Sequence, residues 1–283
     1  MAKRSLMLAG GGLKIPFQAG VLQVWLDEAG IEFDHGDGVS AACFNLAMWV
    51  QGMSGKQIAD NWRHFKPFTA VDVNWSQLPL LFFAESFFEL DAFRKKVFPR
   101  WGIDLNKIRA SQRDATFNVY NFSTHQLRPV TTREITEDFL IATASLPMFF
   151  PPVKLEGDTY IDAVLNTSTN LEEAIRRGAD EVWIIWTTSE RGKWSKGFLG
   201  NFFGIFEATA NYSYRRVLTR IDANNAAIER GLPGEFGRPI KVYELKAEVG
   251  LHYLFNFKQR RFPETVEEGV SAARAWCDAN RIG

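Results

Sequence analysis

The sequence predicts an α/β fold in which a mostly parallel central sheet is flanked by helices. Residues 5–9 and residues 33–39 each have the character of a strand that is followed by a helix, which is the order of elements in parallel α/β proteins. Residues 181–187, E-V-W-I-I-W-T, form a continuous apolar run of the kind found in a strand covered on both faces. These three segments together indicate a sheet with helices on both sides.

Length and charge narrow the classes of protein. The 283 residues are enough to bury a large core, and because no repeat or linker divides them we expect one domain over 1–283. Lys+Arg and Asp+Glu both number 33, so no excess of one charge attracts nucleic acid, and a nucleic-acid partner is disfavoured. Of the two distant cysteines, Cys43 is predicted to be a small buried hydrophobe.

The N-terminal segment is predicted to be a strand and not a signal peptide, because its apolar run is short and is followed by glycines and Lys14. No run approaches the roughly eighteen apolar residues that a membrane span needs. We therefore expect a cytoplasmic protein, with peripheral contact at a membrane surface as a further interpretation. The oligomeric state stays open.

The first strand leads into three glycines, residues 10–12, and a helix from about Phe17 to Glu28, with Pro16 suited to its first turn. Successive glycines let backbone N–H groups come close to a ligand and form an anion site. Ile15 stands where a dinucleotide motif needs its third glycine, and no phosphate-loop lysine motif follows. An oxyanion hole remains as the functional interpretation, beside a plain flexible turn.

Ser40 lies where the second strand turns into a helix over residues 41–50. Residues 38–42 are G-V-S-A-A, which matches the nucleophile-elbow pattern G-x-S-x-G except that Ala42 replaces the second glycine. A serine on this turn is raised at a helix N-terminus, where free N–H groups favour negative charge. The alternative interpretation is an ordinary helix cap, because serine is a favoured N-cap residue.

Residues 53–100 are irregular and strongly aromatic. Their most apolar part, residues 78–90, has the sequence L-P-L-L-F-F-A-E-S-F-F-E-L. Three interpretations stay open for this region: a lid or acyl-chain wall near 71–100, a surface helix that dips into a lipid interface, and the core packing of a helical hairpin. Its aromatic residues are Trp62, Phe65, Phe68, Trp75, Phe82, Phe83, Phe87, Phe88, Phe93 and Phe98.

The second half of the chain continues the alternation. A β-hairpin at 115–131 and a helix at 135–144 precede the proline-rich segment 145–153, and a second hairpin at 154–160 leads directly to Asp162. The remaining predicted elements are a helix at 171–177, the strand at 181–187, a mobile apolar flap at 198–206, a long helix at 208–230, a strand at 239–245 and a helix at 264–281.

Four motifs in this order resemble the patatin-like phospholipase family, and the resemblance extends through most of the chain. The motifs are G-G-G-L-K at 10–14, G-V-S-A-A-C-F-N at 38–45, A-S-L-P-M-F-F-P-P-V at 144–153 and Y-I-D-A-V-L-N at 160–166. The position of Asn45 and the segment 170–185 also match the family's usual continuation. The resemblance implies a three-layer sandwich and a serine–aspartate dyad that hydrolyses acyl esters of lipids.

Carried onto this sequence, the resemblance implies that the Ser40 hydroxyl attacks the ester and that Asp162 takes its proton. The oxyanion hole would be formed by the loop Gly10, Gly11, Gly12 and Leu13. A carboxylate is a weak base in water, so we expect apolar burial to raise its pKa. Lys14 is either a substrate or anion contact or a solvent-facing lysine. Neither a metal nor a cofactor is implied, and no acidic loop has calcium-binding spacing.

Three glycines of the family pattern are replaced here, by Ile15, Ala42 and Ala163. Added side chains disfavour left-handed backbone and close approach, so these positions raise a second hypothesis, a non-catalytic relative that binds acyl lipid or a protein partner. A hidden serine–histidine–aspartate triad through His35 or another histidine is a further alternative. The sequence leaves open which ester is cleaved and whether water or an alcohol accepts the acyl group.

Overall fold

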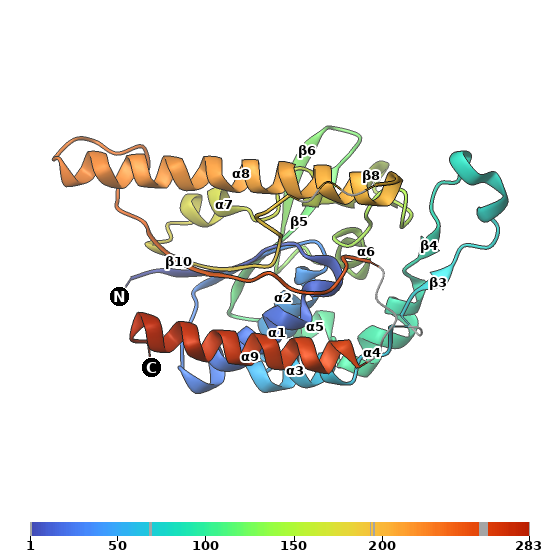
Figure 1. The fold of residues 1–283 in the computed structure, drawn as a ribbon, viewed down its shortest axis with the longest axis horizontal. Coiled ribbons are helices and arrows are strands. Elements are labelled where there is room, and N and C mark those ends of the chain that lie inside the picture. Colours follow the sequence, from blue (N-terminus) through green and yellow to red (C-terminus); the bar gives the residue numbers. More distant parts are fainter. Residues whose placement is uncertain (1, 68–69, 193, 195, 255–259, 283) are drawn as a thin grey trace.

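An eight-stranded sheet forms the centre of the molecule, and helices cover both of its faces (Figure 1). The structure is a computed structural model, and it describes residues 2–282 except 68–69, 193, 195 and 255–259. The sheet strands are β1 (Arg4–Leu8), β2 (His35–Val39), β5 (Asp114–Asn121), β6 (Gln126–Thr131), β7 (Val153–Leu155), β8 (Asp158–Asp162), β9 (Glu181–Trp186) and β10 (Lys241–Lys246). Two further short strands, β3 (Asp72–Val73) and β4 (Phe88–Glu89), form a separate pair.

Most α-helices of the described residues lie where a helix was predicted, whereas those at Gly55–Arg63, Phe98–Trp101 and Leu105–Ala110 were not predicted individually. The α-helices are α1 (Pro16–Leu22), α2 (Ala42–Val50), α3 (Gly55–Arg63), α4 (Phe98–Trp101), α5 (Leu105–Ala110), α6 (Glu137–Ala142), α7 (Leu171–Arg176), α8 (Phe198–Glu229) and α9 (Arg261–Asn280). Short 3-10 turns lie at Gly12–Lys14, Leu78–Phe83 and Ala163–Leu165, and π-helical turns at Gln23–Glu28 and Phe93–Val97.

The strand order is β10-β9-β1-β2-β5-β8-β7, and β6 pairs with β5 as well. The first five of these strands run parallel, whereas β6, β7 and β8 join by antiparallel pairing. In Figure 1, α7 and α8 lie above the sheet and α1, α3 and α9 lie below it. This arrangement confirms the predicted three-layer α/β fold with a mostly parallel sheet.

Two predictions about local structure are wrong. Residues 53–100 are not a helical hairpin, because α3 is followed by the β3–β4 pair, which projects from the body of the molecule (Figure 1). Residues 198–206 are not a separate flap but the first turns of α8. Phe203 and Phe206 are buried there, and this burial outweighs the cost of about 1 kcal/mol for each helical glycine.

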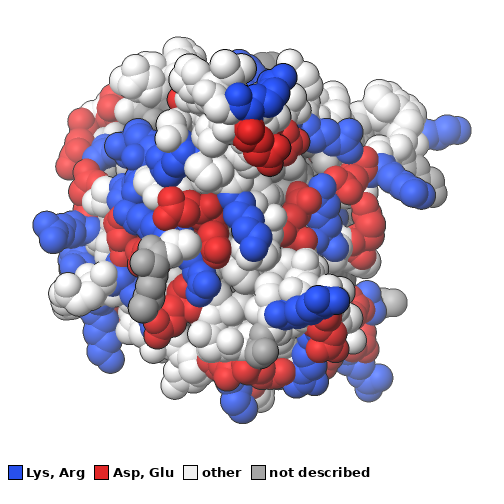
Figure 2. All heavy atoms as spheres, turned by 90° about the vertical axis from the view of Figure 1, so that its left-hand side faces the viewer, with Lys and Arg blue, Asp and Glu red and all other residues white. Residues whose placement is uncertain are grey.

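Charge and hydropathy of the described residues fit the balanced composition. On the end of the molecule that carries both termini, acidic and basic side chains are intermixed (Figure 2). This face therefore offers no broad region of one sign to a nucleic acid. None of the described helices combines the length and the apolar character that crossing a membrane requires.

Candidate active site

Two strands that share one edge of β5 bring Ser40 and Asp162 together. β2 pairs with β5 up to Val39, which lies opposite Asn118, and β8 pairs with β5 from Asp162, which lies opposite Val119. β6 occupies the other edge of β5 over these residues, so β2 and β8 lie end to end along a single edge. Ser40 follows Val39 directly and therefore lies beside Asp162.

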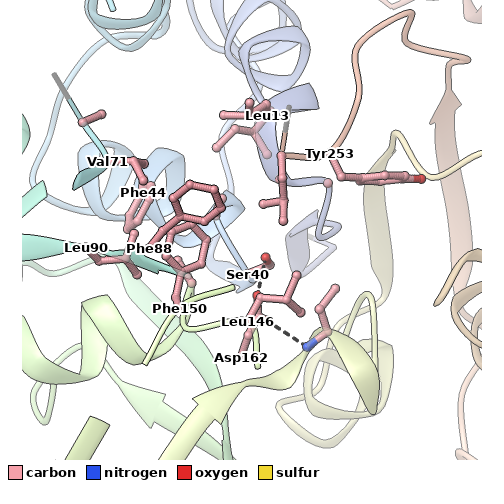
Figure 3. A pocket seen from close by; sticks show the side chains of 18 of the residues that line it. Leu13, Ser40, Phe44, Val71, Phe88, Leu90, Leu146, Phe150, Asp162 and Tyr253 are labelled. Carbon is pink, nitrogen blue, oxygen red and sulfur yellow. Dashed lines mark hydrogen bonds between the residues drawn. The ribbon is translucent and has the colours of Figure 1, made fainter. Parts of the chain in front are cut away.

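Ser40 occupies the left-handed backbone region, at φ 60°, which is uncommon for residues other than glycine. A serine held on such a strained turn between a strand and a helix has the geometry of a nucleophile elbow. Its hydroxyl donates a hydrogen bond of 2.6 Å to Oδ2 of Asp162 (Figure 3). The helix-cap interpretation is wrong, since the N-cap residue of α2 is Ala41 and the Ser40 hydroxyl bonds to the carboxylate instead.

Asp162 is almost fully buried at the end of β8. Its second oxygen, Oδ1, accepts a hydrogen bond of 2.9 Å from the N–H of Val164, which fixes the orientation of the carboxyl group. Burial raises the pKa of Asp162 to about 7, outweighing the hydrogen bonds from Ser40 and Val164, which lower it. A carboxylate with this pKa is a far stronger base near neutral pH than an exposed aspartate.

The glycine loop leaves two backbone N–H groups available. The N–H of Gly10 donates to the carbonyl of Ser168 at 2.8 Å, and the N–H of Leu13 donates to the carbonyl of Tyr253 at 2.7 Å. Gly11 and Gly12 both line the pocket, and within the described residues their N–H groups have no acceptor. Of the four residues predicted to form the oxyanion hole, only Gly11 and Gly12 therefore have N–H groups available. That these groups bind an oxyanion stays a prediction.

Gly12 is the position in this loop that combines a left-handed backbone with a close approach to another backbone segment. Its φ is 52°, and a Cβ there would lie 2.3 Å from the carbonyl oxygen of Tyr253. Gly30 is a matched control, because its φ is 60° and an added Cβ would contact nothing within 4 Å. We expect Gly30→Ala to lower the free energy of unfolding by about 1 kcal/mol, and Gly12→Ala by about 3 kcal/mol. Urea denaturation of both variants measures this difference, and equal losses would contradict the packing described.

The three replaced glycines do not strain the site. Ile15 has φ −65° and ψ −17°, an ordinary right-handed conformation, so its branched side chain is compatible with the backbone. Ala42 begins α2 and Ala163 begins a 3-10 turn, and neither is among the residues with positive φ. None of the three positions therefore has the left-handed backbone that would disfavour a side chain.

Asn45 joins the glycine loop to the pocket. Its Nδ2 donates to the carbonyl of Ile15 at 3.1 Å, and its Oδ1 accepts a hydrogen bond of 2.6 Å from Nε1 of Trp62. Asn45 is fully buried one turn into α2, so a single side chain holds both the end of the loop and one wall of the pocket.

Lys14 is buried, so the interpretation of a solvent-facing lysine is wrong. Its Nζ lies 3.9 Å from the ring centroid of Tyr253, whose hydroxyl donates to Glu207 at 2.8 Å. Burial lowers the pKa of Lys14, while Glu207 and Glu248 raise it. Lys14 does not line the pocket, and a direct contact with substrate stays a prediction.

The histidines do not form a triad with Ser40, because none of the four lines the pocket. His35 is buried in β2, where its ring nitrogens pair with the hydroxyls of Ser5 at 3.2 Å and Thr116 at 3.1 Å. Burial lowers the pKa of His35 to about 4, so it is a neutral structural group. Both ring nitrogens are thus engaged by residues of the neighbouring strands and not by Ser40.

Asp37 is a second buried carboxyl group, and it lies within β2. It accepts hydrogen bonds from Oγ1 of Thr116 at 2.5 Å and Nδ2 of Asn118 at 2.9 Å. Burial raises the pKa of Asp37 to about 7. Because Asp37 does not line the pocket, it is a structural partner of β5.

An apolar pocket opens on Ser40 and Asp162. Its empty volume is about 1110 Å³, counting solvent at its mouth. Figure 3 shows aromatic and aliphatic side chains gathered on one side of Ser40 and Tyr253 on the other. Both predicted wall segments contribute, whereas Phe68 and the side chain of Phe82 lie outside the described residues. The wall residues from these segments are Val71, Phe88, Leu90, Phe93, Phe202, Phe203 and Phe206.

A comparison with known families decides the classification. Residues 6–175 match a family model described as patatin-like phospholipase. The chain belongs to the patatin-like phospholipase family. All four motifs of this patatin-like protein lie inside the matched range, and members of the family are typically lipid acyl hydrolases.

Comparisons with solved structures and with curated proteins do not refine the classification of this patatin-like protein. The crystal structure of VipD from Legionella pneumophila is similar with a TM-score of 0.45 and 12% identity, over 98% of this chain and 67% of that chain. A similarity of this strength supports no conclusion about function. No curated protein matches the chain in sequence.

Tyr253 and Ser168 hold the glycine loop in place, and the sequence did not predict this role for either residue. Each supplies a backbone carbonyl that holds one N–H of the glycine loop. A carbonyl contact carries no side-chain signature, and Tyr253 is separated from the loop by about 240 residues of chain. No signal in the sequence points to either contact.

Proposed function

We propose that the protein is a serine acyl-ester hydrolase that acts on lipids or other hydrophobic esters through Ser40 and Asp162. The observation that carries this proposal is the 2.6 Å hydrogen bond from the Ser40 hydroxyl to a buried carboxylate at the floor of an apolar pocket. A module that only binds acyl chains needs neither the strained serine nor the buried aspartate.

In the proposed mechanism, Asp162 accepts the proton of Ser40 as Oγ attacks the ester carbonyl. The carbonyl oxygen becomes an oxyanion, which the N–H groups of Gly11 and Gly12 stabilise. Collapse of the tetrahedral intermediate expels the alcohol, which takes the proton from Asp162, and leaves the acyl group on Ser40. Asp162 then activates water for the second half-reaction. Each step uses groups that already line the pocket.

The pocket supports the proposed substrate class. Apart from Ser40 and Asp162, its lining is mostly aliphatic and aromatic, as an acyl chain requires. The walls come from both halves of the chain, including α8 beyond the family match. This shared pocket supports the proposal that residues 1–283 work as one catalytic unit.

A series of p-nitrophenyl esters from acetate to palmitate tests the proposal. We expect kcat/KM to rise by up to about fourfold for each added methylene until the pocket is filled, because each methylene leaves water for an apolar wall. The same series with Ser40→Ala is the blank. Equal rates for acetate and decanoate, or activity that survives in Ser40→Ala, would contradict the proposal.

A matched pair of variants locates the acyl chain. Phe93 lines the pocket, whereas Phe98 packs beside it at 6.0 Å between ring centroids without lining the pocket. Both side chains are buried, so Phe93→Leu and Phe98→Leu remove similar packing. Only Phe93→Leu is expected to shift the preferred chain length, toward longer acyl groups. A shift in both variants, or in neither, would place the acyl chain elsewhere.

A further inference from the structure

The segment 72–89, here called the aromatic arm, exposes apolar side chains. It consists of β3, the 3-10 turn Leu78–Phe83 and β4, and it projects from the body of the molecule (Figure 1). Trp75 is 75% exposed, Leu80 47% and Phe83 90%. Exposed aromatic groups on one projecting segment are unusual, because folded proteins normally bury such side chains.

The tip of the arm is uncharged. No Asp, Glu, Lys or Arg occurs from Val73 to Ala84, and the charged residues of the arm are all acidic. These are Asp72, Glu85 and Glu89. A binding partner of the tip must therefore be recognised through apolar and aromatic contact and not through positive charge.

The base of the arm is fixed to the proline-rich segment 145–153, whose residues Leu146 and Phe150 line the pocket. The N–H groups of Phe87 and Phe88 donate to the carbonyls of Met148 and Phe149, at 3.1 and 2.9 Å. The arm is closed on itself by the N–H of Asn74, which donates to the carbonyl of Phe87 at 3.0 Å. These bonds hold the arm in a defined place beside the proline-rich segment.

The base of the arm borders the pocket. Val71, directly before the arm, and Phe88, in β4, line the pocket together with Phe150, and Figure 3 shows them on the apolar side of Ser40. The arm and the pocket thus share Phe88, so a surface that the arm contacts lies on the same side of the molecule as the apolar wall of the pocket.

We propose that the aromatic arm inserts Trp75 and Phe83 into the interfacial layer of a lipid bilayer and so places the pocket mouth at the lipid surface. This inference rests on the proposed function, because a lipid ester has to pass from the bilayer into the pocket. Tryptophan and phenylalanine are the side chains that partition well at the boundary between headgroups and acyl chains. Because the tip carries no cations, we expect the arm to bind neutral lipid, and this binding should not depend on the salt concentration.

Co-sedimentation with vesicles of pure phosphatidylcholine tests the proposal. The experiment uses Ser40→Ala as the parent, so that lipid is not consumed, and compares Trp75→Ala/Phe83→Ala in that background. We expect the double variant to bind at least about tenfold more weakly, because two rings no longer leave water. Phe122→Ala is the matched control, since Phe122 is 53% exposed at the end of β5, and its binding should change less than about twofold.

The other outcomes overturn the proposal. Equal binding by the parent and the double variant would mean that the arm does not contact lipid. Binding that requires anionic lipid, or that is lost at high salt, would mean that charged residues elsewhere bind the membrane. If sedimentation velocity shows a parent dimer that Trp75→Ala/Phe83→Ala dissociates, the arm covers a second copy of the chain.

Catalysis is tested separately from docking. With Ser40 intact, Trp75→Ala/Phe83→Ala should hydrolyse soluble p-nitrophenyl butyrate at the wild-type rate but lose at least about tenfold on phosphatidylcholine vesicles. An inactive wild type that still binds vesicles through the arm would refute the proposed hydrolysis and not the docking. Loss on both substrates would place the arm in the catalytic pocket and refute its role as a docking surface.

Discussion

Replacing Ser40 by glycine is expected to give a more stable protein than replacing it by alanine, and both variants should be inactive. The two variants lack the same hydroxyl and differ only in Cβ. At φ 60° the Cβ of alanine is strained, so Ser40→Gly should exceed Ser40→Ala by about 1 kcal/mol in free energy of unfolding. Both should lose at least about 10³-fold in kcat/KM, because the nucleophile is gone.

The measurement combines urea denaturation with ester hydrolysis, and a helix position serves as the control. At Ser213, in the middle of α8, the usual order should hold, with Ser213→Ala more stable than Ser213→Gly by about 1 kcal/mol. If Ser40→Ala were also more stable than Ser40→Gly, the backbone at Ser40 would not be strained. If either Ser40 variant kept wild-type activity, another residue would be the nucleophile.

The second large effect is a pH dependence set by Asp162. Burial raises the pKa of its carboxyl to about 7, and only the ionised form can accept the serine proton. We therefore expect kcat/KM to increase with pH, with a midpoint near 7 and a plateau above it. Asp162→Asn should lose on the order of 10²- to 10⁴-fold in rate and abolish this titration.

Stability is expected to change with pH in the opposite direction. A carboxyl with a raised pKa holds its proton in the folded state where the unfolded chain has released it, between about pH 4 and 7. Asp162 and Asp37 should therefore make the protein less stable as the pH rises through this window. The variant Asp37→Asn distinguishes the contribution of Asp37 from that of Asp162. It should weaken the pH dependence of stability but leave the midpoint of the activity profile near pH 7. A midpoint that moves with Asp37→Asn would contradict the assignment of the base.

The parts of the fold that could be predicted are those with a local signal. The strand at 181–187 is apolar from Val182 to Trp186, and the turn before Ser40 carries glycines next to a helix-forming run, so both could be recognised from their own residues. The pairing of Ser40 with Asp162 needed the family resemblance. Its physical cause is the shared edge of β5, a relation between three distant strands.

The features that could not be predicted depend on distant contacts or on conformation. Gly10 and Leu13 were expected to donate to an oxyanion, but carbonyls of Ser168 and Tyr253 already accept their N–H groups. The glycines within 198–206 indicated a flap, yet burial of one aromatic face keeps the segment helical. The three replaced glycines raised the hypothesis of a non-catalytic relative because sequence does not show backbone angles, and the φ of Ile15 is right-handed.

The intact mass after reaction with a fluorophosphonate tests the central claim, that Asp162 activates Ser40 for acyl transfer. The wild type should gain a single adduct, at a rate that rises with pH through about 7, and Ser40→Ala should gain none. Asp162→Asn should react at least about 10²-fold more slowly, without this pH dependence. A wild type that stays unlabelled in buffer and in detergent, or an Asp162→Asn variant that reacts at the wild-type rate, would contradict the claim.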